Sequence, residues 1–294
     1  MSSPKESLFE EKKDIIFEVL SDTHFELEKL NDSQKTIKRI EKKLRAYVDT
    51  KPIVYKKAMS GNNIKDGSII SKPFYKCLCL AGDICNIKQL PYVLEAMSDD
   101  YDHIFYVPGN HEYYGEEMDE LDDKLEYLNQ FYGNVTIFTK KCQRVFIYED
   151  LVFHGSTLWF KCQNHGCREH WRLNDFRKIQ KSGQDITLDD IETMFEENVK
   201  EIEKTIELNI DTVVMTHHLP SLECGSHIHP NNHCGFATSI DHVIKPPIAT
   251  WIYGHSHTNL LTHVNDVFLC SNQIGYGNEN NSICTNKIAV MLCF

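Results

Sequence analysis

Five short apolar runs in this chain are each followed at once by aspartate, asparagine or histidine. Short continuous apolar runs predict buried β-strands. In an open α/β sheet, ligands bind just beyond the carboxyl ends of the strands, so these polar residues are expected to meet in one crevice. The runs, each with the polar residues after it, are Ile15–Leu20 with Asp22 and His24, Tyr75–Leu80 with Asp83, Ile104–Val107 with Asn110 and His111, Thr212–Met215 with His217 and His218, and Ala249–Tyr253 with His255 and His257.

Segments of helical periodicity separate these runs. This alternation predicts an α/β fold with helices outside the sheet. Thr187 followed by Asp190 predicts a capping box at the start of the last helix, and the pieces 144–148 and 151–153 predict an antiparallel hairpin. The predicted helices are Glu26–Tyr47, Lys88–Met97, Glu116–Phe131 and Leu188–Leu208, and the remaining predicted strands are Val267–Leu269 and Lys287–Phe294.

No composition break or Pro/Gly/Ser-rich linker divides the 294 residues, which favours a single domain over residues 1–294. Three segments are interpreted as insertions within that domain, namely 26–76, 161–178 and 222–236. The part from Lys51 to Lys76 is basic and weakly patterned and contains Gly and Asn, so we expect a mobile loop there.

The charge of the chain limits its partners. A formal net charge of −12 repels the backbone of duplex nucleic acid. A small phosphorylated substrate remains compatible, because bound metal ions can reverse the field locally. No apolar run reaches the roughly 20 residues that cross a bilayer, and the Lys/Glu-rich start lacks the apolar stretch of a secretory signal. We therefore expect a cytoplasmic protein without a membrane partner, and the sequence leaves its oligomeric state open.

Eleven cysteines, several of them inside apolar runs, predict reduced and buried thiols rather than a disulfide framework. Two of the insertions also combine cysteine with histidine. The first has the residue types of a structural zinc site, but its spacing is tighter than the usual paired-ligand pattern. The second is placed on the rim of the crevice or in a polar loop, and the loop is favoured. The residues concerned are Cys162, His165, Cys167 and His170 in the first, and His227, His229 and His233 in the second.

The spacing of the polar residues suits metal binding. Asp22 and His24 are two positions apart on an extended segment, so both side chains point to one face, and the same holds for His255 and His257. The set offers carboxylates, an amide oxygen and several imidazoles. This mixture suits Mn, Fe, Co or Zn better than Ca or Mg, which prefer shells made of oxygen alone.

The motifs Asp22-x-His24, Gly82-Asp83, Gly109-Asn110-His111-Glu112, His217 and Gly254-His255-x-His257 together resemble those of the calcineurin-like metallophosphoesterases. The stretches 155–159, 173–176 and 273–277 are similar to a poorly characterised branch of single-domain members. The resemblance spans nearly the whole chain. It implies a four-layer α/β/β/α sandwich that binds two divalent metal ions, with Mn, Fe or Zn favoured.

The resemblance also implies a role for each motif residue. Asp83 bridges the two metals, and His111 lies beside them as a catalytic residue that meets the substrate. His217 is preferred over His218 as the ligand because it comes first after the strand. Trp159, Asn174 and Asp175 are placed in the substrate pocket, with core packing as the alternative for Trp159 and turn formation as the alternative for Asn174 and Asp175. The implied sets are Asp22, His24, Asp83 and His257 for the first metal, Asp83, Asn110, His217 and His255 for the second, and His111, His218, Trp159 and Asn174 for the substrate.

The implied reaction is hydrolysis of a phosphate ester by a hydroxide held between the metals, opposite Asp83. His111 then binds a phosphoryl oxygen or protonates the leaving group, with Glu112 or Asp22 orienting its ring. A phosphodiester or nucleotide-type small substrate is favoured. A phosphomonoesterase or protein phosphatase is the alternative, but the Asp-Arg-Gly element of the protein phosphatases is absent after Asp83. A non-catalytic scaffold of the same fold is disfavoured, because the motif residues are retained.

Overall fold

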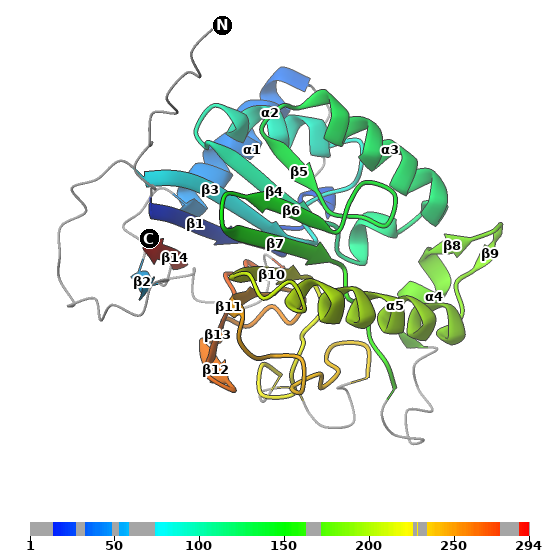
Figure 1. Ribbon diagram of the computed structural model, residues 1–294. Helices are drawn as coiled ribbons and strands as arrows, with labels where there is room; N and C mark the ends of the chain where they lie inside the picture. Colours follow the sequence, from blue (N-terminus) through cyan, green and yellow to red (C-terminus); the bar gives the residue numbers. More distant parts are fainter. Residues whose placement is uncertain are drawn as a thin grey trace, which may run out of the picture.

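Two six-stranded sheets pack face to face, with helices on their outer surfaces (Figure 1). The computed structural model describes residues 14–27, 33–48, 53–58, 74–162, 172–225, 228, 234–276 and 288–293. Three long helices cover the first sheet and one long helix covers the second, which gives four layers (Figure 1). The predicted α/β/β/α sandwich is confirmed.

The first sheet has the strand order β2-β14-β1-β3-β4-β5. Its strands β1, β3, β4 and β5 run parallel, while β14 pairs antiparallel with β1 and parallel with β2. Helices α1, α2 and α3 lie on its outer face (Figure 1). The bounds are β1 Asp14–Leu20, β2 Ile53–Ala58, β3 Phe74–Ala81, β4 His103–Val107, β5 Val135–Ile137, β14 Ile288–Cys293, α1 Ser33–Val48, α2 Leu90–Ser98 and α3 Met118–Phe131.

The second sheet has the order β12-β13-β11-β10-β7-β6. Its four central strands are parallel, and the edge strands β12 and β6 pair antiparallel with their neighbours. Helix α5 packs on its outer face, and a short helix α4 leads into the small hairpin β8-β9. The bounds are β6 Val145–Tyr148, β7 Leu151–Ser156, α4 Asp175–Lys178, β8 Gln180–Lys181, β9 Gln184–Asp185, α5 Leu188–Ile206, β10 Thr212–Thr216, β11 Ile248–Ile252, β12 Thr262–Val264 and β13 Val267–Cys270.

Two clusters of buried apolar residues hold the sandwich together. Alternate residues of the central strands point between the sheets, where Phe17 of β1 meets Phe153 of β7 with ring centroids 5.5 Å apart. The residues in between, such as Leu20 and Val214, pack with the outer helices. Because both faces of these strands are buried, their sequences are continuous apolar runs rather than alternating ones.

Most predicted elements are confirmed, including the 144–153 hairpin and the capping box between Thr187 and Asp190. The helix predicted over Glu26–Tyr47 differs at its start. Phe25–Leu27 is a 3₁₀ turn, and α1 begins at Ser33. The turn forms because the Phe25 backbone N–H donates to the Ile84 carbonyl, 3.0 Å away, and this tertiary bond overrides the helical periodicity.

The predicted mobile loop Lys51–Lys76 is wrong in part. Residues Ile53–Ala58 form the edge strand β2, which pairs in register with β14. The segment Ile53-Val54-Tyr55 has high β propensity, and the two lysines after it are typical of protected edge strands. Residues 59–73 lie outside the described part of the chain.

The described cysteines include buried free thiols, the half-buried free thiol of Cys142 and one disulfide pair. Cys77, Cys79, Cys85, Cys224 and Cys270 are buried free thiols, as predicted, and burial raises the pKa of each. One pair corrects the prediction of reduced thiols: Cys162 and Cys234 form a disulfide that joins the 161–178 and 222–236 segments.

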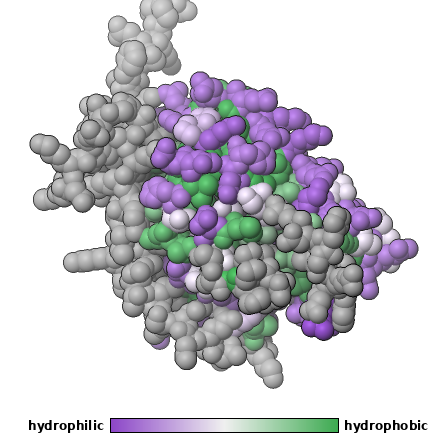
Figure 2. All heavy atoms as spheres, turned by 90° about the horizontal axis from the view of Figure 1, so that it is seen from below, coloured by the Kyte–Doolittle hydropathy of each residue, from purple (hydrophilic) through white to green (hydrophobic). Residues whose placement is uncertain are grey.

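Hydrophilic residues predominate on the coloured surface seen from below, with hydrophobic residues gathered toward the middle of that face (Figure 2). Among the helices in the described ranges, none is long and apolar enough to cross a membrane.

Candidate metal centre

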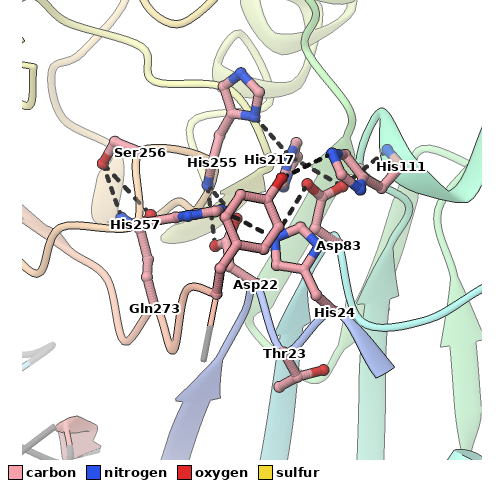
Figure 3. A network of polar contacts seen from close by, with 12 residues as sticks. Asp22, Thr23, His24, Asp83, His111, His217, His255, Ser256, His257 and Gln273 are labelled. Carbon is pink, nitrogen blue, oxygen red and sulfur yellow. Dashed lines mark hydrogen bonds and ion pairs between the residues drawn. The ribbon is translucent and has the colours of Figure 1, made fainter. Parts of the chain in front are cut away.

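The predicted metal ligands lie at the carboxyl ends of five strands, where the edges of the two sheets meet. β1, β3 and β4 of the first sheet and β10 and β11 of the second each contribute. Asp83 lies among the histidines contributed by both sheets (Figure 3). Three groups of possible metal-binding side chains form there: Asp22, His24 and His257; His24, Asp83 and His111; and Asp83, His217 and His255.

One donor cluster surrounds Nε2 of His217. This nitrogen lies 3.1 Å from Asn110 Oδ1, 3.1 Å from His255 Nδ1 and 3.3 Å from Asp83 Oδ1. Donor atoms that share one ion at about 2.0–2.2 Å lie about 3.0–3.4 Å from one another. The spacing therefore fits a single divalent ion bound by these four side chains.

The hydrogen bonds on the far side of each ring show which nitrogen is available. His217 Nδ1 faces the carbonyl of Ala81 at 2.9 Å, and His255 Nε2 faces the carbonyl of Gly235 at 2.9 Å. A carbonyl only accepts, so each of these nitrogens carries the proton. The opposite nitrogens then turn their lone pairs toward Asn110 and Asp83, and an ion among these acceptors satisfies them together.

A second donor cluster is built on His24 and His257, whose Nε2 atoms lie 2.9 Å apart. Asp22 Oδ1 is 3.6 Å from His257 Nε2, and Asp83 Oδ2 is 3.9 Å from His24 Nε2. His24 Nδ1 faces Glu26 Oε1 at 2.9 Å, which again leaves Nε2 for the cluster.

Asp83 lies between the two clusters, with Oδ1 toward His217 and Oδ2 toward His24. Burial opposes ionisation of Asp83, but the imidazoles of His217 and His111 hold its pKa well below the usual range. Burial lowers the pKa of His24 and His217, yet the contact of His24 with Glu26 and that of His217 with Asp83 raise both to about 9 in the metal-free chain. The ionised carboxylate of Asp83 and the raised pKa values of the two histidines both indicate that the centre stabilises positive charge.

The backbone is unusual at five of the seven predicted ligands. Asp22, His24, Asp83, His255 and His257 have φ values between 48° and 77°. Non-glycine residues rarely adopt positive φ, and such strain gathers at functional sites. The extended segments predicted at Asp22–His24 and His255–His257 are therefore wrong, and Asp and His are among the non-glycine residues that adopt positive φ most often.

Two glycines allow the strand ends to approach one another. A Cβ on Gly109 would overlap Asp83 Oδ1 and lie 2.6 Å from the Asp83 nitrogen. A Cβ on Gly82 would overlap the ring of His217 and lie 2.7 Å from the Gly109 nitrogen. These glycines are therefore required for close packing around the ligands.

His111 lies beside the clusters. Its Nδ1 is 3.0 Å from Glu26 Oε1, and its Nε2 is 3.3 Å from the Tyr276 hydroxyl. Burial lowers its pKa, but the charges of Asp83 and Glu26 outweigh burial, so the net shift is upward.

The prediction that Glu112 or Asp22 orients His111 is wrong. Glu112 is 2% exposed and accepts the backbone N–H groups of Asp83, Ile84, Cys85 and Gly109. Both oxygens of Asp22 accept the His255 N–H at 3.0 Å. Sequence analysis missed Glu26, whose spacing of two from His24 was the available signal, because it was assigned to a helix.

Asp175, placed in the substrate pocket by the resemblance, contacts a predicted metal ligand instead. Its Oδ1 accepts from Asn110 Nδ2 at 2.8 Å and from the Tyr114 hydroxyl at 2.7 Å. The first bond orients the amide so that Asn110 Oδ1 faces His217. The neighbouring Asn174, predicted to bind substrate, is exposed, and its Oδ1 accepts from Arg177.

Trp159 and His218, predicted to contact the substrate, are both buried. Trp159 is 3% exposed and packs against Tyr113, which matches the packing alternative. His218 has no exposed surface, and its Nδ1 donates to the Thr157 carbonyl at 3.1 Å. Burial lowers its pKa to about 3, so its ring is neutral.

The Cys/His segments are described only in part. Residues 163–171, 226–227 and 229–233 lie outside the described residues, and with them His165, Cys167, His170, His227, His229 and His233. Cys162, the remaining member of the possible zinc set, is paired with Cys234.

Residues 17–259 match the family model described as calcineurin-like phosphoesterase, which covers most of the chain and all five motifs. The chain belongs to the calcineurin-like phosphoesterases. As a member of this family it is a metal-dependent hydrolase of phosphate esters, and its clustered carboxylates and imidazoles are able to bind metal.

Two further comparisons show proteins that are similar to this chain. An uncharacterized protein, L509, of Acanthamoeba polyphaga mimivirus is 29% identical over 230 residues, which are 70% of this chain and 80% of that protein. The crystal structure of phosphopantetheinyl hydrolase from Mycobacterium tuberculosis has a TM-score of 0.58 and 13% identity, and it covers 90% of both chains. The second likeness shows the fold of this calcineurin-like phosphoesterase alone.

Proposed function

We propose that this calcineurin-like phosphoesterase binds two divalent ions and hydrolyses a small phosphodiester. The observation that carries the proposal is the position of Asp83, with one carboxylate oxygen toward each donor cluster. Asp22, His24 and His257 bind one ion, Asn110, His217 and His255 bind the other, and Asp83 bridges them. Bound there, two ions polarise a phosphoryl oxygen and lower the pKa of a coordinated water.

The chain supplies the rest of the chemistry through His111. Its Nε2 lies on the side of Tyr276, whose ring also packs against His24 and His257 with centroids 4.4 and 4.5 Å apart. In its imidazolium form, with Nδ1–H on Glu26, His111 donates from Nε2 a hydrogen bond to a phosphoryl oxygen, or a proton to the leaving alkoxide. The Tyr276 hydroxyl binds the same phosphate group.

The charge around this site favours a diester over a monoester. Among the described residues, the ion pairs of Asp22, Asp83 and Glu26 are all with histidines. The Tyr276 hydroxyl adds a hydrogen bond to the phosphate but no positive charge. A monoester dianion carries one more negative charge than a diester and benefits from an arginine at this position, so the diester fits better.

The test compares wild-type protein loaded with Mn or Zn on bis(p-nitrophenyl) phosphate, on p-nitrophenyl phosphate and on a panel of nucleotides. We expect a higher kcat/KM for the diester. A higher value for the monoester would replace this proposal by a phosphomonoesterase. Elemental analysis should give two ions per chain.

Asp83→Asn tests the bridging role within the same experiment. The amide has lost the charge and one strong donor, so metal occupancy and kcat should fall together. Full occupancy with normal turnover in this variant would refute the bridge.

A further inference from the structure

Glu26 occupies a position that no motif assigns. It lies in the 3₁₀ turn directly after His24, and its side chain is 15% exposed. Its Oε1 atom is 2.9 Å from His24 Nδ1 and 3.0 Å from His111 Nδ1. One carboxylate oxygen therefore contacts two imidazoles that belong to different motifs, with ring centroids 4.6 Å apart.

A carboxylate oxygen only accepts, so each imidazole carries a proton on Nδ1 and donates it to Glu26. The Nε2 atoms are then directed to different places. His24 Nε2 faces His257, and His111 Nε2 faces the Tyr276 hydroxyl. The orientation and tautomer of a ring follow from the partner of its far nitrogen.

The backbone below Glu26 is firmly held. The His24 and Phe25 N–H groups donate to the carbonyls of Asp83 and Ile84, each at 3.0 Å. The Thr23 hydroxyl donates to the Ile84 carbonyl at 2.8 Å, and the Phe25 side chain is 1% exposed. These contacts anchor the backbone of this segment to the loop after β3. Because the backbone is fixed, the position of the Glu26 carboxylate depends on the length of its side chain.

We propose that Glu26 is a positioning residue that holds the ligand His24 and the substrate-facing His111 in register through one oxygen atom. The inference rests on the proposed function, in which His24 binds the first ion and His111 meets the phosphate. Asp83 does not duplicate this role, since it accepts only the backbone N–H of His111, at 2.9 Å.

The kinetic test uses Glu26→Gln, Glu26→Asp and Glu26→Ala, with Glu197→Gln as the matched control. Glu197 is 46% exposed and pairs with Lys140 on the surface. Loss of a carboxylate that orients a ligand typically lowers metal affinity or activity by about 10–100-fold. We expect such a loss in kcat for Glu26→Gln with little change in KM, a larger loss in Glu26→Ala, and none in the control. Glu26→Asp is one methylene shorter, so it should regain part of the rate.

Coupling to His111 separates positioning from a general structural effect. In a His111→Ala background, Glu26→Gln should reduce kcat by a smaller factor than in the wild-type background, because the part that acts through His111 is already lost and only the part that acts through His24 remains. Losses that multiply would show that Glu26 acts independently of His111, and a wild-type rate in Glu26→Gln would remove the role entirely.

Two readouts do not depend on turnover. In Zn-loaded protein labelled with ¹⁵N-histidine, the Nδ1–H signal of His111, assigned by its absence in His111→Ala, should be lost or shifted in Glu26→Gln. A Mn titration should show weaker binding of one ion in Glu26→Ala. If wild-type protein hydrolysed none of the esters, the proposed function would fail, and these two measurements would still decide the role of Glu26. An unchanged spectrum with unchanged affinity would overturn it.

Discussion

Asn110 and His111 are neighbours, but their side chains have different partners. Asn110 Oδ1 faces His217, whereas the His111 ring lies between Glu26 and Tyr276. His111→Ala should therefore keep both ions and the fold while kcat falls by roughly 10²–10⁴, the range for a positioned acid–base group. The loss should be smaller for p-nitrophenyl esters, whose leaving group needs little proton assistance. Steady-state rates across leaving groups, with elemental analysis, test this.

Two outcomes would change the assignment. An equal loss for good and poor leaving groups would indicate that His111 stabilises phosphoryl charge rather than delivering a proton. Loss of one ion from the variant would make His111 a metal ligand.

The residues that meet at the candidate metal centre could be predicted from the sequence because each follows an apolar run inside a recognisable motif. For Glu26 the spacing of two from His24 was the one signal, and it was overridden because an acidic residue at the start of an amphipathic segment also fits the first turn of a helix. The choice between Asn174 and Asp175 depended on which side chain reaches Asn110, and adjacent polar residues in a turn carry no such signal. Asp and His are enriched at positive φ, but residue type alone does not fix the backbone conformation at a given position.

The glycine before Asn110 makes the contact between the β3 and β4 loops possible. Gly109→Ala should displace Asp83, weaken metal binding and lower the free energy of unfolding by about 1–3 kcal/mol, the usual cost of overpacking. Gly133→Ala is the matched control: a Cβ there meets no atom within 4 Å, so stability should change by less than about 0.5 kcal/mol. Denaturant unfolding and metal titration of both variants test this. Equal stability and equal metal affinity of the two variants would show that the loop after β4 accommodates the added methyl group without displacing Asp83.

His154 of β7 makes the free energy of unfolding depend on pH in the acid range. The side chain is fully buried, its Nδ1 is 2.8 Å from the Thr205 hydroxyl of α5, and burial lowers its pKa to about 3. The unfolded chain takes up a proton near pH 6.5 and the folded chain does not. The free energy of unfolding should therefore fall between pH 6.5 and about 3, by about 1.4 kcal/mol per pH unit.

Metal-free protein in chelator isolates this contribution. The slope of unfolding free energy against pH measures the number of protons taken up on unfolding. Between pH 6 and 4, this number should be smaller by about one in His154→Gln than in the wild-type protein. Burial lowers the pKa of His103 to about 4 in the same way, so some slope remains in the variant. An unchanged slope would show that His154 does not titrate on unfolding.

The strands of the two sheet centres could be predicted because burial on both faces leaves a continuous apolar run. The short pieces were missed for physical reasons. β5 has three residues, and β8 and β9 have two each, too few for any periodicity to appear. β2 gains its partner from β14, at the other end of the chain, and no local pattern encodes that pairing.

The candidate metal centre links the two sheets, because each donor cluster takes side chains from both. Ions that bind the folded state alone should stabilise it, by about 2.7 kcal/mol when the free ion is at 100 times its Kd. Thermal unfolding in chelator and in rising Mn should show an increasing Tm. The rise should be smaller in Asp83→Asn. A Tm that is independent of metal in wild-type protein would contradict the proposed centre.

The loop between β5 and β6 divides the ligands unevenly. Asp22, His24, Asp83 and Asn110 precede it, and His217, His255 and His257 follow it. A polypeptide opened in that loop would leave each cluster with donors on both fragments, while β14 of the second fragment would still pair with β1 of the first. Neither fragment alone would hold a complete site. Reassembly of such a split protein would complete both clusters, so divalent metal would favour complementation of the two fragments.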